Sequence, residues 1–499
     1  MKNKLVINKQ PSFRLLVVLG SFAFLYINAL NFLGTTNSQI YYNLGLILLT
    51  LCPLIILLFI GTLNNPKLLF LSVIFVLPFI PSLSGYLNII GGPFLVVSIE
   101  ILVILGLFFS NLSTIRKTNT DQNIIFFIVL WLIGNTIPAI FSIDFFNSLP
   151  YHFLSIFTVI PWVLLLFALI NSRIINKNNE YLTQAVLPVF CASVACFALS
   201  GLVLIFLNEG TDALDITSII RPTIKGPGYI TNNTISAIAL IAVPIAYALL
   251  KNSIQNGKLY KTLLYLSCIV LYVYIILLDK SRAAFLVMIL FLFILVFNQL
   301  SSLFLRRRHA TKISFRAMIF LLFILTVFLY AFYLGLEGVL MRLSGDETNF
   351  SLSEIIFNTF ISARGTALLV SWNEFLSYPL FGKGYSNNLN YIPTFGEYWN
   401  SHNMILEQLC ATGIIGTFPI FYLLFQCLRA WYKSISRLNE RDSLFANSIL
   451  LSILGLLAFG LASGFLLING YDLKSALPML IFVFLVMSLF RITSLIKEP

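Results

Sequence analysis

The side chains best suited to chemistry in this sequence are one histidine and two arginines that stand beside apolar runs. His402 lies where a Pro/Gly/Asn-rich loop meets an apolar helix, so its ring can be held at a membrane surface and act as a general base. Arg221 and Arg282 are expected at the same membrane depth, and a guanidinium group binds phosphate oxygens through two parallel N–H bonds. These residue types predict a site that acts on a phosphate-bearing lipid.

Each of the three residues also has a structural interpretation. His402 could be an ordinary interfacial histidine, because an unusual position marks a functional site only in a fraction of cases. Arg221 could cap the C-terminus of a helix, and Arg282 could form an ion pair with Asp279. His152 is the other histidine expected on the external face, but no motif surrounds it, and it is the weaker candidate.

Four further charged side chains are accessory candidates: Lys225, Lys280, Arg364 and Glu407. Arg364 could hold a phosphate or the acceptor, or form a salt bridge at a helix terminus. Glu407 follows His402 by five residues inside an apolar span, where an ion pair with an external arginine is the favoured interpretation. The sequence has no external Asp-x-Asp pair and no His/Cys/Asp cluster with the spacing of metal ligands. The predicted site therefore uses no metal ion and no cofactor.

Membrane helices must position these residues, as the composition indicates. Of the 499 residues, 59% are hydrophobic and 10% are charged, and apolar runs recur along almost the whole chain. This composition predicts an all-α polytopic membrane protein. We expect fourteen spans, near residues 13–33, 41–61, 68–86, 93–110, 123–143, 151–171, 184–207, 230–250, 262–279, 283–300, 317–335, 403–427, 446–467 and 475–490.

The net charge of +12 indicates membrane orientation and not nucleic-acid binding. With both termini in the cytoplasm, most Lys and Arg residues fall in cytoplasmic segments. There they are expected to contact anionic membrane lipids. Only eight of the 31 fall in external segments: Arg221, Lys225, Lys280, Arg282, Arg342, Arg364, Lys383 and Lys474. Because cations on the translocated face oppose the insertion bias, at least some of the eight are expected to bind an anion.

The predicted organisation has three parts. Residues 1–207 form N-terminal transmembrane helices, residues 208–427 form a central domain, and residues 428–499 form C-terminal transmembrane helices. The central domain contains two external loops, 208–229 and 336–402.

An amphipathic helix is expected in the second loop. Its apolar face is formed by residues at helical spacing: Leu368, Leu369, Trp372, Phe375 and Leu376. Such a helix either lies in the interface plane, with Trp372 at headgroup depth, or packs on the external ends of the bundle.

The segment from Arg364 to Gly416 contains several motifs in a characteristic order. Arg364 is followed by Trp372, then by PLFGKG, SHNMILEQL and ATGIIG. This order and spacing resemble the conserved C-terminal domain of the bacterial O-antigen ligase and O-antigen polymerase superfamily. RPTIKGPGYITNN and the Ser281-Arg282-Ala283 element resemble two further motifs of the superfamily, although the first lacks its usual proline between two asparagines. The resemblance covers about residues 220–420.

The resemblance implies a fold, a reaction and roles for residues. It implies a class C glycosyltransferase in the bacterial inner membrane, with the active site on the periplasmic face. It also implies that Arg221 and Arg282 hold the diphosphate of an undecaprenyl-diphosphate-linked glycan and that His402 is the base acting on the acceptor. Transfer by single displacement inverts the configuration at C1.

Four alternatives remain at this point. A ligase would use lipid A-core as the acceptor, and this label is favoured because the Arg221, Arg282 and His402 set is complete. A polymerase would use a second lipid-linked repeat unit. A flippase or other transporter would also bind the diphosphate lipid, but the sequence lacks internal repeats and has a long external loop, which argue against it. A structural scaffold would tolerate replacement of the external cations.

Overall fold

The structure is a computed structural model that describes residues 57, 60, 65–79, 92–111, 119–141, 159–172, 179–209, 232–279, 281, 283–291, 293–294, 363–384, 390–392, 397–399, 403–463 and 473–494. The expected spans at 13–33 and 317–335, and most of 41–61, lie outside these residues. The number of fourteen spans therefore remains a prediction.

The described residues are almost entirely helical, as the composition predicts. In chain order the labelled elements are α3 (Pro66–Val76), η1 (Leu77–Phe79), α5 (Gly92–Asn111), α6 (Asn119–Ile140), α8 (Asn179–Tyr181), η3 (Leu182–Val186), α9 (Leu187–Glu209), α10 (Asn232–Gln255), α11 (Leu259–Asp279), α15 (Ala363–Ser377), β1 (Asn390–Ile392), β2 (Glu397–Trp399), α16 (Met404–Ser434), α17 (Glu440–Ser463) and α18 (Leu473–Ser494). Two further helical segments are Val159–Ile170 and residues 283–291.

Six of the described helices are long and apolar enough to cross a membrane: Leu182–Val203, Thr234–Gln255, Leu259–Asp279, Met404–Ser434, Glu440–Leu461 and Leu477–Ser494. This confirms an all-α membrane protein as the fold class. The described residues differ from an all-α protein at one place, a small antiparallel hairpin, in which Tyr391 of β1 lies opposite Tyr398 of β2. The sequence analysis treated that stretch as loop.

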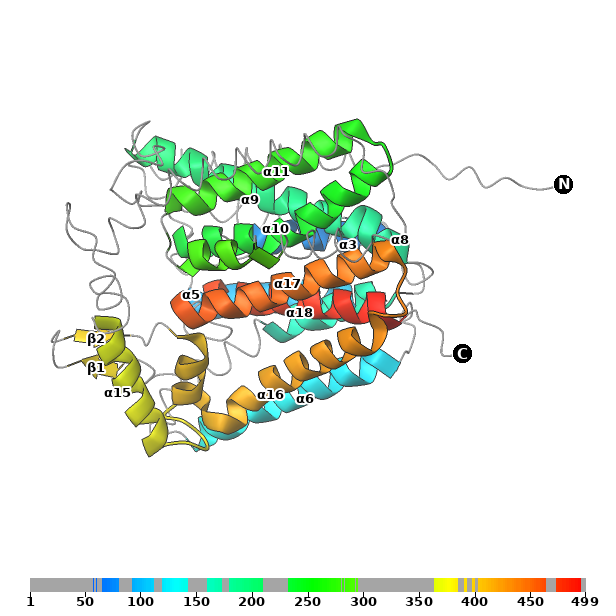
Figure 1. Ribbon diagram of the computed structural model, residues 1–499. Coiled ribbons are helices and arrows are strands. Elements are labelled where there is room, and N and C mark those ends of the chain that lie inside the picture. Colours follow the sequence, from blue (N-terminus) through cyan, green and yellow to red (C-terminus); the bar gives the residue numbers. More distant parts are fainter. Residues whose placement is uncertain are drawn as a thin grey trace, which may run out of the picture.

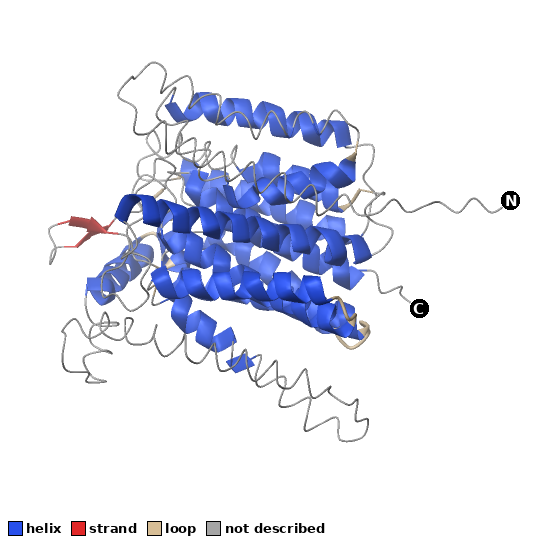
Figure 2. Ribbon diagram, turned by 90° about the horizontal axis from the view of Figure 1, so that it is seen from above, coloured by secondary structure: helices blue, strands red, loops and turns tan. Residues whose placement is uncertain are grey.

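The helices lie side by side with alternating direction (Figures 1 and 2). The turns that join α10 to α11 and α16 to α17 lie at one end of the bundle, and α15 with the β hairpin lies at the opposite end (Figure 1). We call these the basic end and the hairpin end. The name of the basic end comes from its Lys and Arg residues, which include Lys251, Lys258, Lys261, Lys433, Arg437 and Arg441.

The centre of the bundle is formed by α10 and α18. The spanning windows of these two helices are 89% and 94% buried, whereas that of α11 is only 56% buried. A helix that is apolar on all sides belongs in a core, and α10 and α18 match that pattern. Ser452 of α17 joins this core, because its hydroxyl donates to the carbonyl of Ile241 in α10 at 2.7 Å.

Two glycines allow α6 and α16 to cross closely. A Cβ added to Gly134 would lie 2.8 Å from the carbonyl oxygen of Ile415, and one added to Gly416 would lie 2.7 Å from the carbonyl oxygen of Gly134. Small residues at such crossings let helix backbones approach in a membrane, where van der Waals packing drives association. The crossing holds residues 414–434 of α16 in place against α6. The N-terminal part of α16 is thereby supported at the hairpin end.

Candidate active site

The motif-bearing helix α16 is broken near its N-terminus. Gly413 has φ 64° and ψ −166°, which divides α16 into a short segment, residues 404–412, and a long segment, residues 414–434. Figure 1 shows the short segment turning away from the long one toward α15. The span expected near 403–427 corresponds to α16, but the chain changes direction at Gly413 within it, and the long segment continues to Ser434.

The PLFGKG loop, residues 379–384, binds this break through backbone hydrogen bonds in both directions. The N–H groups of Lys383 and Gly384 donate to the carbonyls of Cys410 and Ala411, at 2.7 and 3.0 Å. From the other side, the N–H groups of Ile414 and Ile415 donate to the carbonyls of Pro379 and Leu380, at 2.9 and 3.2 Å. A helix break leaves backbone groups without intrahelical partners, and the loop satisfies them.

Two glycines with positive φ make this contact possible. A Cβ on Gly413 would lie 2.3 Å from the carbonyl carbon of Leu380, and a Cβ on Gly382 would lie 2.5 Å from the carbonyl carbon of Ala411. Both positions combine a left-handed backbone with contact against backbone atoms that cannot rotate away. The loop and the break therefore form one docked unit, which we call the loop–break contact.

Helix α15 is attached to the same unit by side chains. The thiol of Cys410 donates to the carbonyl of Ser371 at 3.0 Å, and Lys383 forms an ion pair with Glu374 at 2.5 Å. The Lys383 side chain is only 15% exposed. Lys383 was one of the eight external cations expected to include anion ligands, but the structure gives it a carboxylate partner within the protein.

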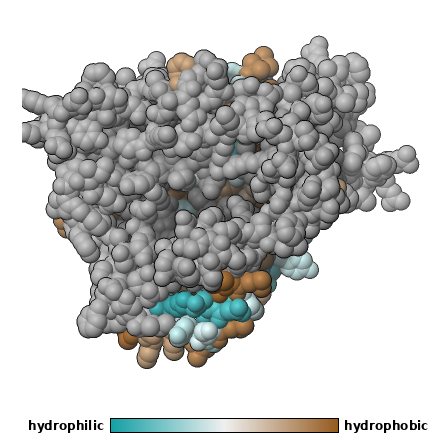
Figure 3. Space-filling view, turned by 90° about the vertical axis from the view of Figure 1, so that its left-hand side faces the viewer, coloured by the Kyte–Doolittle hydropathy of each residue, from teal (hydrophilic) through white to brown (hydrophobic). Residues whose placement is uncertain are grey.

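Helix α15 packs on the bundle, which is one of the two arrangements expected for it. Phe375, a residue of the expected apolar face, is buried against Leu406 and Cys410 of α16. Leu369 and Trp372 are 66% and 47% exposed and form an apolar edge. Figure 3, which faces the hairpin end, shows hydrophobic surface beside hydrophilic surface at its lower edge. The helix therefore packs on α16 while presenting an apolar edge to its surroundings.

Asn403 fixes the start of α16. Its side-chain oxygen accepts from the N–H of Leu406 at 3.0 Å, which makes it the N-cap, and its side-chain NH₂ donates to the carbonyl of Leu461 in α17 at 3.2 Å. Asn403 directly follows His402 in the chain. Asn403 is not among the predicted site residues, although an asparagine before an apolar run is a common N-cap signal.

Glu407 lies in the first turn of α16 and is 2% exposed. Its N–H donates to the carbonyl of Asn403 at 2.9 Å. A carboxylate is favoured at this position because the positive end of the helix dipole lies close by. The neighbouring Gln408 is equally buried and donates to the hydroxyl of Thr412 at 2.9 Å, so the short segment carries a buried polar stripe.

The residues beside Arg282 are also buried at a helix junction. Ser281 and Ala283 are each 6% exposed, and the carbonyl of Ser281 accepts from the N–H of Phe285 at 3.0 Å. Asp279, the last residue of α11, accepts a hydrogen bond from the hydroxyl of Ser236 in α10. This junction lies at the hairpin end of the bundle (Figure 1).

Of the predicted site residues, the structure fully describes only Glu407. The backbone of Arg364 lies in the first turn of α15. The other predicted site residues lie outside the described residues: His402, Arg221, Arg282, Lys225 and Lys280. What the structure does describe is the framework around three motifs. The loop–break contact and the Asn403 cap both belong to α16, and the Ser281 junction lies at the end of α11.

A comparison with protein families supports these motifs as a unit. Residues 267–421 match the family model described as O-antigen ligase. The match confirms the resemblance to the O-antigen ligase and polymerase superfamily over that segment, which includes Arg282, the PLFGKG loop, His402 and Glu407. Arg221 precedes the matched segment, so its assignment stays a prediction. A search of curated proteins finds no match to this chain.

Proposed function

Starting from the match of residues 267–421 to the O-antigen ligase family, we propose that this protein is an inner-membrane glycosyltransferase. It transfers a glycan from undecaprenyl diphosphate to an acceptor hydroxyl on the periplasmic face. The observation that carries the proposal is the loop–break contact, because it holds two of the matched motifs together beside the buried start of α16, and α16 begins two residues after His402. A site that positions a base requires such a rigid framework.

The reaction assigns one task to each predicted site residue. As the bond between C1 and the diphosphate oxygen breaks, negative charge develops on the diphosphate, and Arg221 and Arg282 stabilise that charge. His402 accepts the proton of the acceptor hydroxyl while the hydroxyl oxygen forms the new bond to C1. Undecaprenyl diphosphate leaves, and the single displacement inverts the anomeric centre. The assignment uses no metal ion and no cofactor.

The distribution of charge supports the orientation in this proposal. Most of the described cations lie at the basic end, many of them on the turns between α10 and α11 and between α16 and α17. Positively charged loops of membrane proteins remain on the cytoplasmic side. The basic end then faces the cytoplasm, and the hairpin end, with α15 and the start of α16, faces the periplasm.

The acceptor separates a ligase from a polymerase. The purified protein is incubated with an undecaprenyl-diphosphate oligosaccharide and, in separate reactions, with lipid A-core or with a second lipid-linked repeat unit. We expect transfer to lipid A-core. A ladder of products from lipid-linked repeats alone would make the protein a polymerase. Absence of transfer in both reactions, with binding of the donor intact, would replace the proposal by a transporter.

Replacing Asn403 by alanine is expected to reduce transfer beyond its effect on stability. Loss of an N-cap destabilises a helix by about 1 kcal/mol, and here it also frees the residue next to His402 from α17. The matched control is Asn439→Ala, because Asn439 caps α17 at the basic end by accepting from the N–H of Asp442 at 2.8 Å. Thermal midpoints should fall alike in both variants, whereas initial transfer rates should fall only in Asn403→Ala. Equal rate losses would assign Asn403 a purely structural role.

A further inference from the structure

A cavity of about 320 Å³ opens at the basic end, away from the candidate active site. It lies between η3 with the start of α9, the turn from α10 to α11, and the start of α17. Its charged lining residues are Lys258, Lys261, Glu440 and Arg441. Amide and hydroxyl side chains complete the polar lining, among them Gln184, Asn252 and Asn256.

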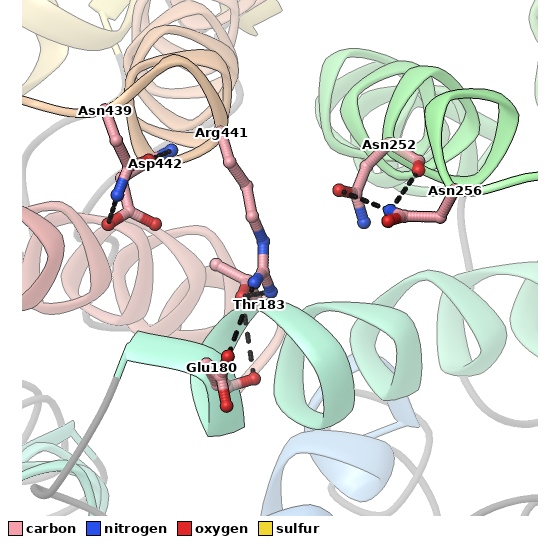
Figure 4. Close-up of polar contacts among 7 residues, drawn as sticks. All are labelled: Glu180, Thr183, Asn252, Asn256, Asn439, Arg441 and Asp442. Carbon is pink, nitrogen blue, oxygen red and sulfur yellow. Dashed lines mark hydrogen bonds and ion pairs between the residues drawn. The ribbon is translucent and has the colours of Figure 1, made fainter.

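Arg441 reaches from α17 toward Thr183 of η3 and Glu180 of α8 (Figure 4). One of its terminal N–H groups donates to the hydroxyl of Thr183 at 2.6 Å, and the other lies 3.8 Å from the Glu180 carboxylate. The Glu180 side chain is 62% exposed, so this long ion pair neutralises the guanidinium only weakly. The buried Nε of Arg441 has no hydrogen-bond partner among the described residues.

The opposite wall of the cavity comes from α10 and the turn that follows it. The side-chain NH₂ of Asn256 donates to the carbonyl of Asn252 at 2.6 Å, and Figure 4 shows both side chains across from Arg441. Lys258 lies two residues after Asn256, and its N–H donates to the carbonyl of Ser253 at 3.0 Å, which holds the turn against the helix. Amide groups and two lysines therefore line the same cavity as a guanidinium.

The charges around the cavity favour an anion. Three cations and one carboxylate, Glu440, line it, so the lining carries a net positive charge. The basic residues after α10 and those before α17 lie far apart in the chain, in segments expected to contact anionic membrane lipids. The fold brings them to one cavity, where several donors can bind the same group of oxygens.

The position of the cavity suits a group at the membrane surface. The candidate spans that surround it end or begin at Leu182, Gln255, Leu259 and Glu440. The cavity therefore lies at the level where these helices leave the apolar layer, which is the level of lipid headgroups.

We propose that this cavity is an anion site that binds a phosphate group, supplied by an anionic phospholipid headgroup or by phosphate in solution. The inference goes beyond the proposed transfer reaction, because the site lies at the opposite end of the bundle from the glycan site. Binding there would join α9, α10 and α17 at their basic ends and stabilise the bundle by linkage.

The test uses the purified full-length protein and two probes. The first probe is a nanodisc of phosphatidylcholine with or without phosphatidylglycerol, and the second is inorganic phosphate added to protein in neutral detergent. The readouts are the lipids retained in native mass spectrometry and the thermal midpoint. Variants are Arg441→Gln and Lys258→Gln, and the matched control is Lys433→Gln, which removes an exposed cation of the basic end outside the cavity.

The wild type should retain phosphatidylglycerol or bind phosphate, and either variant of the cavity should weaken that binding about tenfold or more. Lys433→Gln should bind as the wild type does. Lys258→Gln leaves the contact of Arg441 with Thr183 in place, so a loss of binding there is not a folding defect. Binding of phosphatidylglycerol without phosphate would identify a lipid site, and competition between the two would identify a general phosphate site. No binding of either probe, or equal losses in Lys433→Gln and Lys258→Gln, would overturn the proposal.

Discussion

Replacement of His402 by asparagine should reduce the rate of glycan transfer about 10²- to 10⁴-fold, which is the usual contribution of a general base. Asparagine is close to histidine in size and remains polar, but it cannot accept the proton of the acceptor hydroxyl. Binding of the lipid-linked donor should remain, because the diphosphate is assigned to the arginines. The measurement is the initial transfer rate at saturating donor, together with donor binding to each variant.

The chain offers a matched control for this prediction. It contains three histidines, and His152 is the other one expected on the external face. His152→Asn should transfer at the wild-type rate. If His402→Asn kept its rate and His152→Asn lost it, the assignment of the base to the O-antigen ligase motif would be wrong.

Arg282 should show a different pattern from His402. Arg282→Lys keeps the positive charge but loses bidentate binding, so it should retain more transfer than Arg282→Ala. Both variants should bind the donor more weakly than the wild type. A variant that bound the donor normally would instead indicate that Arg282 has a structural role, such as an ion pair with Asp279.

Replacement of Gly413 by alanine should undock the PLFGKG loop and give the largest loss of stability among single substitutions in the described residues of the hairpin end. A non-glycine residue at positive φ costs about 1–3 kcal/mol. In addition, the new Cβ would lie 2.3 Å from backbone atoms of Leu380, which cannot move without breaking the loop–break contact. The expected readout is a lower thermal midpoint and increased maleimide labelling of Cys410, which is 1% exposed in the intact protein.

A substitution at Gly257 distinguishes the two causes of the lost stability, namely the cost of positive φ and the contact with Leu380. Gly257 has the same φ of 64°, but a Cβ there would meet nothing within 4 Å. Gly257→Ala should therefore show only the backbone cost and leave the labelling of Cys410 unchanged. If both variants lost the same stability, the contact with Leu380 would contribute nothing.

Much of the helical framework is predictable from local composition. The spans expected at 230–250 and 262–279 correspond to α10, Asn232–Gln255, and α11, Leu259–Asp279. Long apolar runs bounded by polar residues predict such helices because a membrane helix satisfies its backbone hydrogen bonds internally. The same reasoning predicted the amphipathic character of α15, but it could not separate the side that packs on α16 from the side that stays exposed.

The break in α16 was not predictable in the same way. ATGIIG has the composition of an ordinary apolar helix with two glycines, and nothing local distinguishes Gly413 from Gly416. Gly413 breaks the helix and Gly416 packs against α6, because the two glycines have different partners. Leu380 approaches Gly413, and Gly134 approaches Gly416.

The sequence by itself determined the membrane class, most helix positions and the family resemblance, because these depend on residue types and on spacing along the chain. Only the tertiary structure decided which segments meet. It joined the PLFGKG loop to the break in α16, gave Lys383 a partner in Glu374, and brought Lys258 and Arg441 to one cavity. Such contacts link residues distant in the chain, and they depend on packing and backbone hydrogen bonding that no local pattern records.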